Sequence, residues 1–169
     1  RARVVAYGLF DAKDFAGMAG DWAILRLDDC LGERFGYLRH ARTTARAAPM
    51  PDGPLMTIGY PASRAGMAGI TIETGCRARD HGPVDGLVGV DCAFESGMSG
   101  GPVLQLQPDG AWIVVGMIQQ SMAPVPGVLP VYTMEHRNQM IAVGAFRGAI
   151  DTALRADAQR LLARRAPAR

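Results

Sequence analysis

Apolar and polar positions alternate over short runs that are broken by turn residues, and this pattern predicts a protein built mainly of β-strands. The predicted strands span residues 3–10, 21–27, 55–59, 69–75, 87–90, 102–107, 111–118 and 127–133. Between two of them, Asp109-Gly110 predicts a tight hairpin.

The pattern changes toward the C-terminus. Phe146, Ile150 and Leu154 recur at helical spacing, so residues 145–164 are predicted to form an amphipathic helix. Residues 40–54 are rich in Arg, Ala and Pro without any period and predict a linker. Many short strands with one terminal helix indicate an all-β barrel or sandwich, and the absence of strand–helix alternation argues against an α/β fold.

The composition is that of a globular domain. The chain has 169 residues, of which 49% are hydrophobic and 20% charged, so it can bury a core and does not have the composition of a disordered chain. The net charge of +2 comes from the last 19 residues, with five arginines and two aspartates; residues 1–150 carry 13 basic and 14 acidic side chains. A charge confined to the tail argues against nucleic acid as the main partner. No apolar run is long enough to predict a membrane span.

The three cysteines leave two interpretations open. Cys76 and Cys92 lie 16 residues apart across a glycine-rich stretch that a hairpin could close. We expect a disulfide, which would contribute roughly 3 kcal/mol, and the alternative is a pair of buried thiols. A zinc site of Cys76, His81 and Cys92 is disfavoured because the ligands lack a paired spacing. Cys30 has no evident partner in the sequence.

The most informative stretch is residues 96–104, SGMSGGPVL. A serine between glycines can present its hydroxyl and its backbone amide to a substrate carbonyl. Gly97 would let its own N–H point to the same place as that of Ser99, and two such donors make an oxyanion hole. The alternative is a glycine-rich β-turn that happens to contain a serine.

Asp21 opens the apolar stretch Asp21–Leu25. A carboxylate buried there would need a hydrogen-bond partner, and an imidazole N–H held for base catalysis is the natural one. The alternative is an aspartate in the turn that precedes a strand.

Together the two motifs resemble those of chymotrypsin-like (trypsin-fold) serine peptidases. In that family an Asp-x-Ala-[Leu/Ile]-Leu strand carries the triad aspartate, as in Asp21–Leu25 here, and a Gly-x-Ser-Gly-Gly-Pro turn carries the nucleophile, as in Gly97–Pro102. Asp91-Cys92, with Cys76 upstream, resembles the bacterial glutamyl-endopeptidase-like branch. The resemblance implies a double β-barrel. Residues 1–45 would be a remnant of the first barrel, 46–143 the second barrel with the nucleophile turn, and 144–169 a C-terminal helix and tail.

The resemblance also implies an activity, a serine endopeptidase that forms an acyl-enzyme on polypeptide substrates without metal or cofactor. Ser99 would be the nucleophile, Asp21 would orient a histidine, and the N–H groups of Gly97 and Ser99 would hold the oxyanion. We expect a secreted or periplasmic monomer.

Substrate contacts follow from the same resemblance. The floor of the specificity pocket lies six residues before the serine, at Ala93, which offers no carboxylate to an arginine or lysine side chain. Cleavage after basic residues is therefore not expected. Gln119, Gln120 and Ser121 would form the edge that pairs with the substrate backbone.

Two departures from the family pattern stand beside it. The family's histidine precedes the aspartate, but His40, His81 and His136 all follow Asp21. The simplest interpretation is an N-terminally truncated sequence whose histidine lies upstream, so that this chain alone is inactive. Met98 stands where animal members carry an aspartate, as expected of bacterial members matured by another route.

Two other function classes remain. A protease-like binding module with an incomplete triad would keep the fold without the reaction. An α/β-hydrolase is also conceivable, because Gly97–Gly101 fits G-x-S-x-G and His136 follows the serine. That elbow requires a helix after the serine, whereas a β-like run follows Ser99, which disfavours it.

Overall fold

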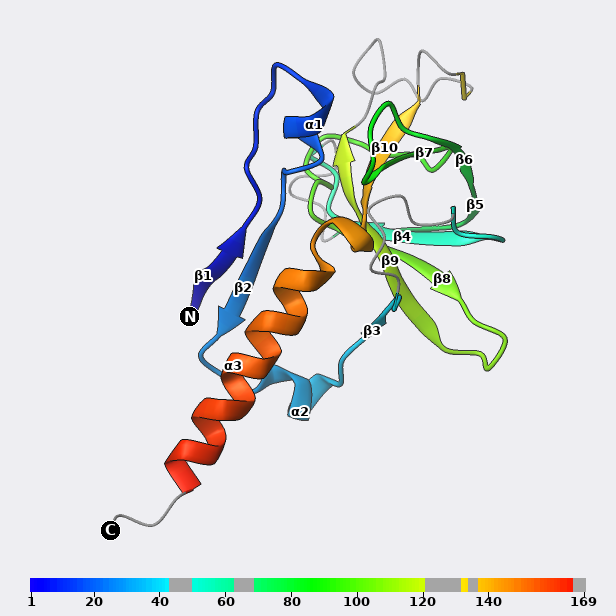
Figure 1. Ribbon diagram of the computed structural model, residues 1–169. Helices are drawn as coiled ribbons and strands as arrows, with labels where there is room; N and C mark the ends of the chain where they lie inside the picture. The colour runs from blue at the N-terminus through cyan, green and yellow to red at the C-terminus, as the bar shows by residue number, and fades with distance from the viewer. Residues whose placement is uncertain (43–49, 63–68, 121–131, 134–136, 166–169) are drawn as a thin grey trace.

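The structure is a computed structural model that describes residues 1–42, 50–62, 69–120, 132–133 and 137–165, with side chains through residue 162. Its strands and helices follow the chain as shown in Figure 1. The strands are β1 (Ala2–Tyr7), β2 (Ala23–Leu27), β3 (Arg39–His40), β4 (Leu55–Gly59), β5 (Thr71–Cys76), β6 (Ala78–His81), β7 (Leu87–Val90), β8 (Pro102–Leu106), β9 (Trp112–Gln120) and β10 (Asn138–Ala142). The helices are α1 (Phe15–Met18), α2 (Leu31–Phe35) and α3 (Arg147–Arg165), the last preceded by a 3₁₀ turn at Val143–Ala145.

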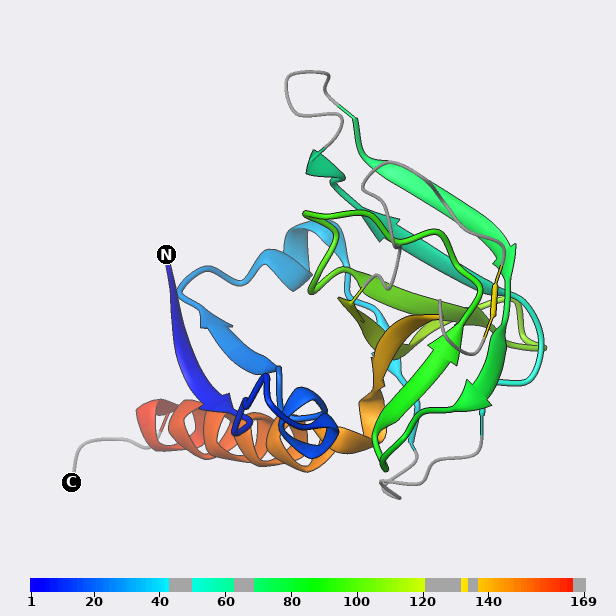
Figure 2. The ribbon, with the colours of Figure 1, turned by 90° about the horizontal axis from the view of Figure 1, so that it is seen from above.

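The main sheet has the strand order β5-β4-β8-β9-β10-β7-β6, and β3 pairs with β9 in parallel. Its other neighbours are antiparallel. β5 and β6 stand at the two ends of this order, yet only Arg77 separates them along the chain. The sheet therefore curls until its ends approach each other, as Figure 2 shows.

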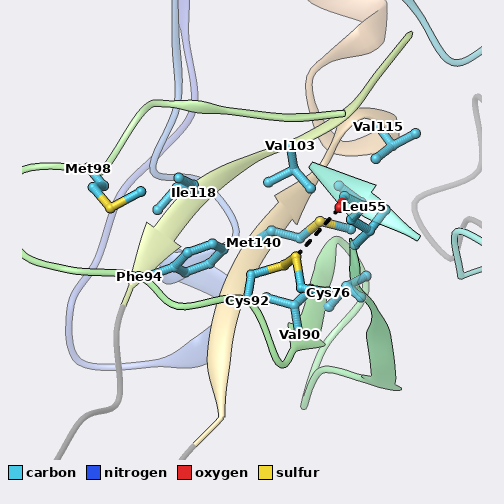
Figure 3. Packing of buried hydrophobic residues seen from close by; sticks show 12 residues of the cluster. Leu55, Cys76, Val90, Cys92, Phe94, Met98, Val103, Val115, Ile118 and Met140 are labelled. Atoms are coloured by element: carbon cyan, nitrogen blue, oxygen red, sulfur yellow. Dashed lines mark hydrogen bonds between the residues drawn. A yellow bond between two sulfur atoms is a disulfide. The ribbon is translucent and has the colours of Figure 1, made fainter. Parts of the chain in front are cut away.

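The inner face of this curled sheet holds the larger hydrophobic core, drawn in Figure 3. Its buried members include Leu55, Val90, Phe94, Met98, Val103, Ile118 and Met140. The expected disulfide between Cys76 and Cys92 lies in this core, with Cα atoms 4.9 Å apart. It joins the end of β5 to the segment after β7, so it ties the two ends of the sheet together. Cys30 is an exposed free thiol.

A smaller region lies beside the sheet. β1 and β2 form a separate two-stranded antiparallel ribbon, which runs along α3 in Figure 1. Trp22 packs against Phe146 with 6.1 Å between ring centroids, and Arg26 is paired with Asp157 at 2.8 Å. Residues 1–42 thus supply a ribbon, two short helices and β3, and they close no barrel of their own.

The predicted elements were right in kind for most of the described chain. The Asp109-Gly110 hairpin joins β8 to β9, and the Ala111 amide donates to the Asp109 side chain at 3.0 Å. β1 ends earlier and β2 begins later than predicted, and β3 occupies the start of the predicted linker. β6, β10, α1 and α2 were not predicted. The strand expected at 127–133 falls almost wholly outside the described residues, and residues 132–133 are not in a strand.

The protein is thus mostly β, with one curled sheet and a C-terminal helix. Within the described residues, no helix combines the length and the apolar character that crossing a membrane requires.

Candidate active site

Ser99 sits in a turn that is fastened on both sides. The Gly101 amide donates to the Met98 carbonyl at 2.9 Å, and the Gly100 amide donates to the Ile118 carbonyl at 2.8 Å. Met98 is buried in the core, whereas Ser99 is exposed. The turn therefore presents the serine at the surface while its neighbour anchors it inside.

Gly97 is required by the geometry of this turn. Its φ is +92°, in the left-handed region that side chains rarely adopt. A Cβ there would lie 2.8 Å from the Tyr60 carbonyl oxygen and 3.0 Å from the Ala62 amide nitrogen, both fixed backbone atoms. No other residue fits this position without a shift of the main chain.

The amides of the turn divide into two groups. Those of Met98, Gly100 and Gly101 donate to carbonyls. Those of Gly97 and Ser99 donate to no acceptor in the described part of the chain. The two N–H groups expected to form the oxyanion hole are therefore available, and that role stays a prediction.

Ser99 and Asp21 line one cleft of about 470 Å³ between the ribbon and the main sheet. Gly100 and Gln119 contribute to its lining, and the Ser99 hydroxyl donates to the Gln119 carbonyl at 3.3 Å. No hydrogen bond joins Asp21 directly to Ser99. This is the arrangement that a third group between them would need.

Asp21 differs from expectation in its burial. It lies in the turn before β2, where its amide donates to the Met18 carbonyl at 3.2 Å, and it is exposed rather than buried. Its carboxylate has no partner among the described residues. The reason is that the ribbon has nothing packed on its outer side in this structure, so the strand it opens is itself half-exposed.

None of the described histidines lies in this cleft. His40 is on β3, with its Nδ1 3.1 Å from the Ala41 carbonyl oxygen, and His81 is exposed at the end of β6. His136 lies outside the described residues. The described residues thus bring together a serine and an aspartate without an imidazole.

The predicted substrate-binding residues occupy two places. Gln119 and Gln120 are the last residues of β9, and Ser121 lies outside the described residues. Ala93 is half-buried, and its amide donates to Glu73 Oε2 at 2.6 Å. Burial raises the pKa of Glu73, an effect that the Ala93 hydrogen bond opposes and the nearby Asp91 strengthens. Glu73 was not singled out from the sequence.

The zinc alternative loses its ligands. Cys76 and Cys92 are bonded to each other, so neither offers a thiolate to a metal. Asp91 is the acidic group nearest to them, and it accepts from the Arg77 amide and from Arg79.

The α/β-hydrolase alternative is also excluded by the local structure. The residues after Ser99 enter strand β8 at Pro102, whereas a nucleophile elbow leads into a helix.

Comparison with known proteins adds no family. No protein-family model matches the chain, and no curated protein matches it. The function must therefore be inferred from the residues of the site.

Proposed function

We propose that the protein is a serine-type endopeptidase of the trypsin-like, double-barrel class, which cleaves peptide bonds in the cleft between ribbon and sheet. The observation that carries the proposal is the shared cleft. Ser99, on a turn with two available amides, and Asp21, from a distant part of the chain, line the same cavity.

The proposed reaction has two stages. Ser99 Oγ attacks the substrate carbonyl while an imidazole between Ser99 and Asp21 takes its proton, and the amides of Gly97 and Ser99 hold the oxyanion. Expulsion of the amine, which takes that proton, leaves an acyl-enzyme that water hydrolyses. The imidazole has to come from outside the described residues, because neither described histidine lines the cleft.

The test supplies the missing base from solution. The 169-residue chain is treated with a fluorophosphonate probe while imidazole is titrated in. We expect covalent labelling of Ser99 that rises with imidazole, falls in Asp21→Asn and vanishes in Ser99→Ala. Labelling of another residue, or none at high imidazole, contradicts the proposal.

A second candidate is a protease-like binding module, and the exposed, unpartnered Asp21 favours it. Such a module would hold an extended peptide along the end of β9 without cleaving it. Peptide binding that is unchanged in Ser99→Ala, with no labelling under the conditions above, would support this alternative.

A secreted or periplasmic location belongs to the proposal as well. The Cys76–Cys92 disulfide is compatible with an oxidising compartment, where such bonds persist.

A further inference from the structure

Glu73 projects from β5 toward the inner side of the curled sheet. Its cross-strand neighbour on β4 is Thr57, which is fully buried, and Glu73 itself is half-buried. Side chains alternate along a strand, and Ile72 accordingly lies on the outer side with 56% of its surface exposed. The sheet thus turns a carboxylate inward and an isoleucine outward.

That carboxylate meets the segment that leads to the nucleophile turn. Glu73 Oε2 accepts the Ala93 amide at 2.6 Å, and Ala93 lies six residues before Ser99. The contact is held in place by the disulfide, since Cys92 directly precedes Ala93 and Cys76 ends the strand that carries Glu73. Position 93, which has no carboxylate of its own, therefore has one beside it from another strand.

The negative charge of Glu73 is not neutralised within the described part of the chain. The nearest arginine that could serve, Arg79, is engaged by Asp91, with Nε 2.6 Å from Oδ2. Asp91 adds further negative potential at Glu73. The hydrogen bond from Ala93 uses one oxygen, and a carboxylate can accept further donors. A half-buried, unneutralised carboxylate costs free energy that a cationic ligand would recover.

We propose that Glu73 is the specificity-determining carboxylate of the site, and that it selects substrates with an arginine or lysine side chain at the cleavage position. The inference rests on the proposed peptidase function. It replaces the expectation, drawn from Ala93 alone, that basic side chains are not favoured. An acidic side chain would be rejected by like charge.

The test measures binding of a small cation and needs no catalysis. Benzamidine is compared with neutral benzamide and anionic benzoate on the 169-residue chain by calorimetry. We expect benzamidine to bind at least about tenfold more tightly than benzamide, as a charge-assisted hydrogen bond allows. Equal affinity for benzamidine and benzamide overturns the proposal without any variant.

Two matched variants locate the charge. Glu73→Gln keeps an acceptor for the Ala93 amide but removes the charge, and we expect it to lose the preference for benzamidine. Glu95→Gln makes the same change closer to Ser99, and we expect it to keep the preference. The reverse result, with the preference lost only in Glu95→Gln, assigns the charge to Glu95 and overturns the inference.

The outcome is separable from that of the peptidase proposal. Ser99→Ala is expected to bind benzamidine like the unaltered chain, because Ser99 does not contact Glu73. Benzamidine binding without fluorophosphonate labelling would remove the peptidase and leave a cation site. Labelling of Ser99 without selective benzamidine binding would leave the peptidase and remove this specificity.

Discussion

The main sheet and the N-terminal ribbon differ sharply in how they are held. Every residue of β7 and of β10 is buried, whereas β1 and β2 contain no buried residue. In the ribbon, Val4 and Leu25 are 55% and 57% exposed despite their apolar side chains. Burial is the main source of stability, so the sheet carries the fold and the ribbon is attached to it.

This difference passes through the candidate site. Ser99 stands on a turn anchored in the sheet by Met98, and Asp21 stands at the start of a ribbon strand. The ribbon is fastened mainly by Trp22 against Phe146 and by the Arg26–Asp157 ion pair. The serine is therefore rigidly placed, while the position of Asp21 depends on a few contacts with α3.

The largest contrast is expected between core and ribbon truncations. Met98→Ala should cost about 2–5 kcal/mol of unfolding free energy because it opens a cavity in the core. Leu25→Ala should cost less than about 1 kcal/mol because its side chain is already exposed. Urea unfolding measures both, and equal losses would break the comparison.

Removing the disulfide should come next. The double variant Cys76→Ala, Cys92→Ala is expected to lose about 3 kcal/mol, since the bond constrains the unfolded chain. Cys30→Ala is the control, because this cysteine is exposed and unpaired. The measurement is urea unfolding without reductant. If reductant lowers the midpoint of the Cys30→Ala chain no further than that of the double variant, the bond does not stabilise the sheet.

The nucleophile turn should respond more than a loop of similar backbone geometry. Gly97→Ala has a left-handed φ and a Cβ clash with backbone, so we expect a loss of about 1–3 kcal/mol. Gly110→Ala has a φ of +79° but open space, so its loss should be nearer about 1 kcal/mol. Thermal unfolding compares them, and only Gly97→Ala should also reduce labelling of Ser99.

The smallest effect is expected at Glu73, and it depends on pH. Burial raises the pKa of Glu73, so the folded state disfavours its ionised form. The stability of the unaltered chain relative to Glu73→Gln should therefore be greatest at acidic pH, below the ordinary glutamate range. It should fall as pH rises from that range through the raised pKa. Urea unfolding at several pH values tests the sign, and a relative gain in stability with pH would contradict it.

Much of the sheet follows from local patterns in the sequence. Asp109-Gly110 specifies a hairpin, and the apolar run at 111–118 is long enough to predict a buried strand. The Cys76–Cys92 pairing followed from spacing and the glycines between the two residues. Each of these signals lies within a short stretch of chain.

β10 and β6 were missed because their patterns contradict their positions. β10 begins with Asn138 and Gln139, polar residues that are nevertheless buried. Asn138 is accommodated because its side-chain amide donates to the Cys92 carbonyl at 2.6 Å, a contact across 46 residues. β6 reads Ala-Arg-Asp-His, a polar composition suited to an edge strand. Only long-range contacts make these segments strands.

The candidate site divides in the same way. Ser99 and Asp21 were found from short motifs, and the fold brings both to one cleft. Glu73 was missed because apolar Ile70 and Ile72 alternate with it and would be expected to face the core. The structure exposes both isoleucines and turns the carboxylate inward. No local pattern signals that inversion.

The position of β10 also sets the order in which the molecule can form. β10 lies between β9 and β7, and Ile141 pairs with both Met117 and Leu87. The β8–β9 hairpin can form early from neighbouring residues, but β7 and β6 have no connection to it until the chain has been made as far as residue 142. During synthesis the apolar strand Leu87–Val90 must wait unpaired on one side, exposed to other chains. A sheet closed by its last strand is expected to refold on the millisecond-to-second scale of non-local β topologies.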